Sequence, residues 1–252
     1  MTALMRKPWI WSFIATALVF LTTILVTGGA SMAGLAQATL TFAAFSVIVG
    51  IGQMLVITLG PGNIDLSVPA TMTLAGTVAL KLMGVEDGMV VPGLLVAIGI
   101  GVLIGTGNYA LIKLLRIPPI IATLSMSFVV QSTAIWTNRG LRIKPPPVLA
   151  DFTTSTTAGI PNVAIIALIL SAIVWVLLQK TVYGRWIAAI GQSIRAARMA
   201  GIPIDGVRFV TYVLCAIVAS ICGYLLASFS GGAALNIVPD TCTVDFECRG
   251  IG

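Results

Sequence analysis

The chain has 252 residues, of which 58% are hydrophobic and 9% charged, with a formal net charge of +6 and a mean hydropathy of +1.07. Because a soluble domain carries about 25% charged residues, a soluble core could not enclose this much apolar surface, and we expect an all-α, polytopic helical membrane protein. The strand-type alternation of a β-barrel is absent, and the positive residues are dispersed in short loops, so we expect no nucleic acid among the partners.

Apolar runs of about twenty residues, the length that crosses the hydrocarbon core, predict about seven transmembrane helices. Trp9 and Trp11 suit the membrane interface at the start of the first helix, which we expect to be retained, since its apolar run is too long for a signal peptide. The interval 138–160, which contains three successive prolines and a TTSTT run, is expected to be an irregular segment that caps the outer mouth. The predicted helices span roughly residues 9–29, 38–59, 65–84, 89–113, 118–137, 161–180 and 209–230.

The distribution of Lys and Arg predicts a cytoplasmic N-terminus, because the loops on that side then hold the larger share of positive charge. The cytoplasmic set is Arg6, Lys7, Lys113, Arg116, Lys180, Arg185, Arg195, Arg198 and Arg208, and the outer set is Lys81, Arg139, Arg142, Lys144 and Arg249.

The chain contains no His and no CxxC pair, so we expect no catalytic residue, no metal site and no cofactor bound to the chain itself. Cys215 and Cys222 are seven residues apart in an apolar run, where we expect them to pack as small hydrophobic side chains. Cys242 and Cys248 lie in the tail.

Polar residues near the junction of the second and third helices are candidates for the translocation pathway or its gate. Asp65 has two compatible interpretations: it caps a helix by accepting from the N–H of Ser67 or Val68, or it lines a gate together with Asn63. We include Ser67 and Gln53 among the pathway candidates, although Gln53 could instead bond between helices. In the fourth helix, Gly93, Ala97, Gly101 and Gly105 form a stripe of small residues, which predicts internal packing or, alternatively, a subunit interface.

The loop 180–208 is basic and contains a short predicted helix over residues 194–200, with Ser193 as N-cap and Gly201 and Pro203 as the stop. On this helix Ala196, Met199 and Ala200 share one face, and the two arginines share another. Such a helix could lie on anionic lipid headgroups or dock in a groove of a cytosolic partner.

Two stretches resemble one known family. GPGNIDLSVPATMTLAG (60–76) resembles the signature of permeases in ribose/xylose-type sugar ABC importers, and YGRWIAAIGQSIRAARMAGI (183–202) is similar to their coupling segment. The resemblance covers roughly residues 10–236 and implies an all-helical fold with about ten transmembrane segments. It also implies a coupling helix that fits a cleft on an ATPase, at Arg195, Ala196, Ala197, Arg198 and Gly201.

The partners that the resemblance implies are cytoplasmic ABC ATPase subunits, a periplasmic sugar-binding protein and a second permease copy or homologue, in contact with membrane lipid. The chain has no GxxxxGK[ST] motif, so we expect that it is not an enzyme and that ATP binds the partner subunit.

The sequence departs from the family at three places. Arg195 stands where relatives often have Glu, and Pro69 replaces the usual Gly after IDLSV. The last residues, 237–252, form an atypical polar tail after the permease domain 1–236, and we expect a truncation or frameshift rather than a natural C-terminus.

We therefore predict a multi-pass permease subunit of a monosaccharide importer in the bacterial inner membrane. The alternatives are a branched-chain amino-acid-type ABC permease, a secondary transporter or channel, and a non-functional truncated permease fragment. The IDLS motif favours sugar, and ion coupling has little support because Asp65 is the single acid near a helix interior.

Overall fold

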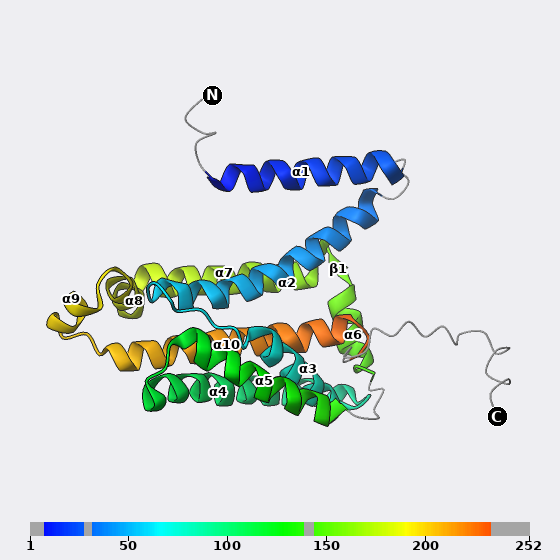
Figure 1. Ribbon diagram of the computed structural model, residues 1–252. Coiled ribbons are helices and arrows are strands. Elements are labelled where there is room, and N and C mark those ends of the chain that lie inside the picture. Colours follow the sequence, from blue (N-terminus) through cyan, green and yellow to red (C-terminus); the bar gives the residue numbers. More distant parts are fainter. Residues whose placement is uncertain (1–7, 28–31, 139–143, 233–252) are drawn as a thin grey trace, which may run out of the picture. The chain divides into compact units, whose positions relative to one another are not determined.

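The computed structural model describes residues 8–27, 32–138 and 144–232, and the chain divides into two compact units, residues 1–43 and 44–252 (Figure 1). Nearly all of the described chain is helical. The elements are α1 (Pro8–Thr27), α2 (Met32–Thr58), α3 (Val68–Met83), the 3-10 helix η1 (Asp87–Met89), α4 (Val90–Leu115), α5 (Pro119–Asn138), α6 (Pro147–Thr154), the strands β1 (Thr156–Thr157) and β2 (Ile160–Pro161), α7 (Asn162–Lys180), α8 (Val182–Gln192), α9 (Ile194–Met199) and α10 (Ile204–Phe229).

The all-α, polytopic membrane fold is confirmed. Each of the seven predicted apolar runs contains one helix. Among the described residues, five segments are both long and apolar enough to span a membrane. The apolar part of α1 and the whole of α3, which has 16 residues, are shorter. The spanning segments are Gly34–Thr58, Asp87–Leu115, Pro119–Asn138, Asn162–Lys180 and Ile204–Phe229.

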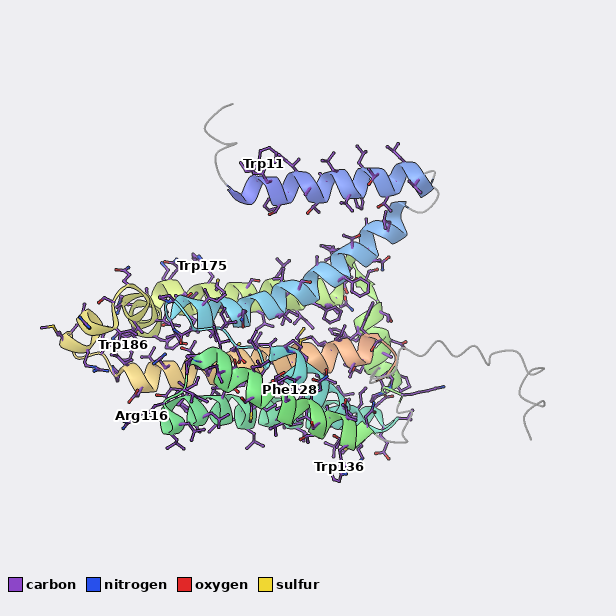
Figure 2. The ribbon with its side chains drawn as sticks, viewed as in Figure 1. Trp11, Arg116, Phe128, Trp136, Trp175 and Trp186 are labelled. Atoms are coloured by element: carbon purple, nitrogen blue, oxygen red, sulfur yellow. The ribbon has the colours of Figure 1, made fainter. Side chains whose placement is uncertain are left out.

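The first unit consists of α1 and the beginning of α2. Its apolar side chains face outward, as Trp11 does at 57% exposure (Figure 2). The hydroxyls of Thr16 and Thr39 donate to backbone carbonyls four residues earlier. A threonine that bonds in this way needs no water, so these polar groups are compatible with a lipid environment.

In the second unit α10 runs alongside α3 and α4, and its side chains are largely buried (Figure 1). One core cluster, around Leu80 and Tyr224, lies toward the end that holds α6. Another, around Ile187, Ile204 and Tyr212, lies toward the end that holds α8 and α9. Apolar side chains therefore pack around α10 toward both ends of this unit.

Small residues allow α4 to approach the backbone of α10 closely. A Cβ added at Gly101 would lie 2.8 Å from the Ala216 carbonyl oxygen, and one at Gly105 would lie 2.6 Å from the Val213 Cα. Real Cβ atoms do not approach other atoms this closely, so both positions require glycine. The predicted packing role of the small-residue stripe is confirmed, since its contacts lie within the chain.

We expect Gly105→Ala to lower the free energy of unfolding by about 1–3 kcal/mol, because the added methyl group must displace the backbone of α10. Gly99→Ala is the matched control, since it lies on the same helix and an added Cβ there meets nothing within 4 Å. Thermal unfolding of both variants in lipid–detergent micelles measures the difference. Equal midpoints for the two variants would contradict the close helix contact.

The outward faces of α5 and α7 carry large apolar side chains. Phe128, Trp136 and Trp175 are 63%, 72% and 58% exposed, and Figure 2 shows Trp136 and Trp175 at the outline of the molecule. A soluble surface rarely exposes this much contiguous apolar area, whereas lipid solvates it. These faces are consistent with contact to the bilayer.

The interval between α5 and α7 differs from the expectation of an irregular segment. Pro147 begins the short helix α6, where a proline costs no hydrogen bond, and β1 and β2 form a hairpin that pairs Thr156 with Pro161. Residues 139–143 of this interval, and the atypical tail 237–252, lie outside the described residues. The third helix starts at Val68 rather than at residue 65, and residues 59–67 form a non-helical connection between α2 and α3.

Candidate functional site

Positive charge gathers at one end of the second unit. At this end lie the last turns of α4 and α7, the helices α8 and α9, and the first turns of α10 (Figure 1). An ion pair of 3.3 Å joins Lys113 of α4 to Asp205 of α10 there. The described cations at this end are Lys113, Arg116, Lys180, Arg185, Arg195, Arg198 and Arg208, whereas Lys81 lies in the last turn of α3 and Lys144 precedes α6.

The predicted short helix in loop 180–208 is confirmed as α9. The Ser193 hydroxyl accepts from the Ala196 N–H at 3.3 Å and so caps its start. Gly201 follows the helix with φ +72°, and the Gly201 and Ile202 amides donate to the carbonyls of Arg198 and Ala197. The left-handed backbone at Gly201 ends the helix without strain because glycine has no Cβ.

The helix α8 in the same loop was missed. Its N-cap is Thr181, whose hydroxyl accepts from Gly184, and it buries Ile187 and Ile190 on one face. In the sequence, this helix was indicated by Thr181 as a possible N-cap and by two isoleucines three residues apart. The Tyr183 hydroxyl of α8 lies 2.7 Å from that of Thr211 on α10, and burial raises the pKa of Tyr183, so the phenol stays neutral.

The side chains of α9 do not all face outward. Ala197 is 3% exposed and packs in the cluster with Ile187 and Ile204, whereas Met199 is 91% exposed. Arg195, Ala196 and Arg198 are exposed as well. Ala197 therefore attaches α9 to the rest of the chain, and its predicted place in a coupling helix stays a prediction.

The end of α8 lies against the end of α2. A Cβ added at Gly191 would lie 2.1 Å from the Thr58 carbonyl oxygen, and one at Gly60 would lie 3.4 Å from the Gly191 carbonyl oxygen. Gly60 also has a φ of +111°, a backbone conformation that favours glycine. Loop 180–208 and the α2–α3 connection are thus in backbone contact immediately before α9.

Three of the pathway candidates meet in the α2–α3 connection, residues 59–67. Asp65 is 3% exposed, and one of its oxygens accepts from the Ser67 N–H at 2.9 Å and from the Ser67 hydroxyl at 2.6 Å. The Asn108 amide of α4 donates to both Asp65 oxygens at 3.3 Å and to the Ser67 hydroxyl at 2.7 Å. The predicted hydrogen bond from the Ser67 N–H to Asp65 is present, and Ser67 itself directly precedes α3.

Asn63 connects this cluster to α10. Its side-chain oxygen accepts from Arg208 at 3.0 Å and from the Tyr212 hydroxyl at 3.3 Å, and its amide donates to the Gly60 carbonyl at 3.1 Å. Asn63 is 4% exposed; its bond with Tyr212 is buried and its bond with Arg208 is partly buried. The Asn63 group and the Asp65 group are joined through the backbone of segment 59–67, and we call the six residues Asn63, Asp65, Ser67, Asn108, Arg208 and Tyr212 the polar network.

Sequence reasoning missed three members of this network. Asn108 is an amide inside an apolar run and could have been identified on that basis. Arg208 was treated only as a loop charge, and Tyr212 was not singled out, because their contacts are more than 140 residues away in sequence. The fourth pathway candidate, Gln53, lies on α2, and its buried Oε1 has no hydrogen-bond partner among the described residues.

A cavity of about 390 Å³ lies between α3 and α10. Most of its lining is apolar, but Thr73, Thr77 and Ser230 contribute hydroxyls. None of the four pathway candidates lines it. The full lining is Pro69, Met72, Thr73, Thr77, Gly223, Leu226, Ala227, Ser230 and Gly232.

Cys215 and Cys222 are buried free thiols, which confirms that they pack as small apolar side chains. Among the described residues no cluster of three or more His, Cys, Asp or Glu side chains is placed to hold a metal ion.

Comparison with known proteins gives consistent matches. A family described as "Branched-chain amino acid transport system / permease component" matches residues 35–246. The chain is 36% identical over 192 residues to the galactofuranose transporter permease protein YtfT of Escherichia coli K12, which covers 75% of this chain and 55% of that protein. It is 34% identical over 185 residues to the probable ABC transporter permease protein y4mJ of Sinorhizobium fredii. That match covers 73% of this chain and 54% of the y4mJ protein.

The ribose import permease protein RbsC of Escherichia coli K12 is 29% identical over 191 residues, with 71% of this chain and 57% of that protein covered. The chain thus spans about half the length of the curated relatives that it matches. No solved structure matches it.

Proposed function

Since the chain belongs to the family of branched-chain amino acid transport system / permease components, we propose that it forms part of the translocation pathway of an ABC importer for a monosaccharide. It is a multi-pass membrane protein. Two of these relatives are named for galactofuranose and ribose, which supports a sugar substrate. The alternative substrate, a branched-chain amino acid, rests on the description of the family alone.

The observation that carries the proposal is α9, a capped and exposed helix at the positively charged end of the second unit. Cytoplasmic loops are enriched in Lys and Arg, so this end faces the cytoplasm. An ATPase subunit that binds and hydrolyses ATP docks on Met199 and the arginines of α9, and its closure moves the helices as rigid bodies to alternate access.

The remaining partners follow from the same assignment. A periplasmic sugar-binding protein delivers the substrate at the opposite end, and a second permease copy or homologue completes the pathway. Asn63, Asp65, Ser67 and Gln53 stay candidates for lining or gating that pathway, although the first three are almost fully buried within this chain.

The test is reconstitution of the chain with its cognate ATPase and binding protein in liposomes. We expect ATP-dependent uptake of a radiolabelled monosaccharide from a panel of ribose, galactose and fructose, and no uptake with a non-hydrolysable ATP analogue. Uptake of leucine in place of every sugar would establish the amino-acid alternative. Failure of the ATPase to co-purify with the chain would contradict the importer assignment itself.

A further inference from the structure

The helix α9 and the first turn of α10 form one packed body. Ala197 of α9 lies in the same core cluster as Ile204 and Val207 of α10, and all three are at most 8% exposed. The connection between the helices is closed by hydrogen bonds from the Ile202 amide to the Ala197 carbonyl and from the Ile204 amide to the Ile202 carbonyl. A displacement of α9 therefore carries the start of α10 with it.

Arg208 lies in the second turn of α10, next to this packed body, and donates to Asn63. Asn63 belongs to the segment 59–67, whose buried Asp65 and Ser67 side chains accept from Asn108 of α4. The same segment is attached to α5, because the Leu66 N–H donates to the Thr123 hydroxyl at 3.1 Å. Asn63 is thus the position at which the α9–α10 body is bonded to a segment that also contacts α4 and α5.

We infer that the Asn63–Arg208 hydrogen bond transmits movement of α9 to segment 59–67, so that both are positioning residues for transport. The inference rests on the proposed function, because it assumes that an ATPase moves α9. The bond is charge-assisted and directional, and its acceptor Asn63 is 4% exposed, so it transmits displacement better than the Lys113–Asp205 pair, whose side chains are 54% and 68% exposed.

The polar network also leaves buried atoms unmatched. Arg208 Nε and Asn108 Oδ1 have no hydrogen-bond partner among the described residues. Buried polar groups are normally paired, and an unpaired one calls for a physical explanation. The inference includes a second arrangement of the network in which these two atoms gain partners, because a transmitting element requires two states.

Asn63→Ala is the variant that tests the link, because it removes the acceptor for Arg208 and Tyr212 and leaves α9 unchanged. Lys113→Ala is the matched control: it breaks the Lys113–Asp205 pair at the same end of α10, which is exposed and does not involve segment 59–67. Arg208→Lys keeps the positive charge and can still donate to Asn63, so this variant should keep part of the coupling that Asn63→Ala loses.

The first measurement is the number of sugar molecules transported per ATP hydrolysed in the reconstituted complex. We expect Asn63→Ala to lower this ratio about tenfold while ATPase binding and basal hydrolysis persist, with Arg208→Lys intermediate and Lys113→Ala at the wild-type value. A merely structural role would lower the amount of complex and leave the ratio unchanged. An unchanged ratio in Asn63→Ala overturns the inference.

The second measurement does not depend on the sugar. Hydrogen exchange of peptides from segment 59–67 is compared with and without a trapped ATP analogue. We expect a nucleotide-dependent change in the wild-type complex and its loss in Asn63→Ala, with the response of α9 retained in both. If segment 59–67 of the wild type does not respond, the inference fails even where transport is intact; if it responds but no sugar is transported, the substrate assignment fails instead.

Discussion

Replacing Asp65 with alanine is expected to lower the free energy of unfolding by about 3 kcal/mol. The carboxylate accepts from the Ser67 N–H, the Ser67 hydroxyl and the Asn108 amide, and these donors are buried. Alanine leaves them without an acceptor in a place that water does not reach, which costs more than the loss of an exposed bond. Reversible denaturation in lipid–detergent micelles measures the change.

Asp151→Ala is the control for this substitution, because Asp151 is an exposed acid on α6 and its loss should change stability by less than about 0.5 kcal/mol. A double-mutant cycle with Asn108→Ala isolates the contact between the two side chains. The double variant should be more stable than the sum of the single effects predicts, since it removes a donor and its acceptor together. Strict additivity would show that Asp65 and Asn108 do not interact.

The long helices could be predicted from sequence because lipid imposes a simple rule. A spanning helix must satisfy its own backbone and present apolar side chains over about twenty residues, so α4, α5, α7 and α10 are visible as runs bounded by Pro, Gly or charge. The start of α3 was misplaced by three residues because Asp65 and Ser67 bond to each other and to α4, and this keeps residues 59–67 out of the helix.

The polar network could not be predicted in the same way. Whether Asn63 faces lipid, a pathway or another helix depends on where α10 lies, and nothing in the local sequence around Asn63 encodes Arg208 or Tyr212. The short helices α6 and α8 were missed for a related reason. They lie outside the apolar runs, and their stability comes from packing of side chains such as Leu149 and Ile187 against the neighbouring helices of the second unit.

The same limit applied to α9, where periodicity correctly placed the arginines and Met199 but could not tell which alanine faces inward. Ala196 is exposed and Ala197 is buried, although both are small and adjacent. A bulky residue at Ala197 therefore tests the fold rather than docking, because it would overpack the cluster with Ile187 and Ile204. A test of docking has to use a side chain that touches nothing in this chain.

Met199→Ala meets that condition and is expected to weaken binding of the cognate ATPase by about 2 kcal/mol, or roughly 30-fold. The side chain is 91% exposed, so its removal leaves the core unchanged, and alanine keeps the helix propensity of α9. In a cleft of the partner the same thioether would become buried between the arginines, where a flexible apolar side chain contributes most to affinity. Binding of the ATPase subunit to the permease in lipid nanodiscs gives the dissociation constant.

Leu114→Ala is the matched control, since Leu114 is 77% exposed at the same end of the second unit but lies on α4. We expect its affinity for the ATPase to equal that of the wild type. If Met199→Ala binds as tightly as Leu114→Ala, α9 is not the docking helix, and its exposed methionine and arginines would instead contact anionic lipid, which vesicle binding of the same variant detects. Loss of affinity in Met199→Ala alone assigns the contact to α9, because both variants remove a similar exposed apolar surface and differ only in the helix that carries it.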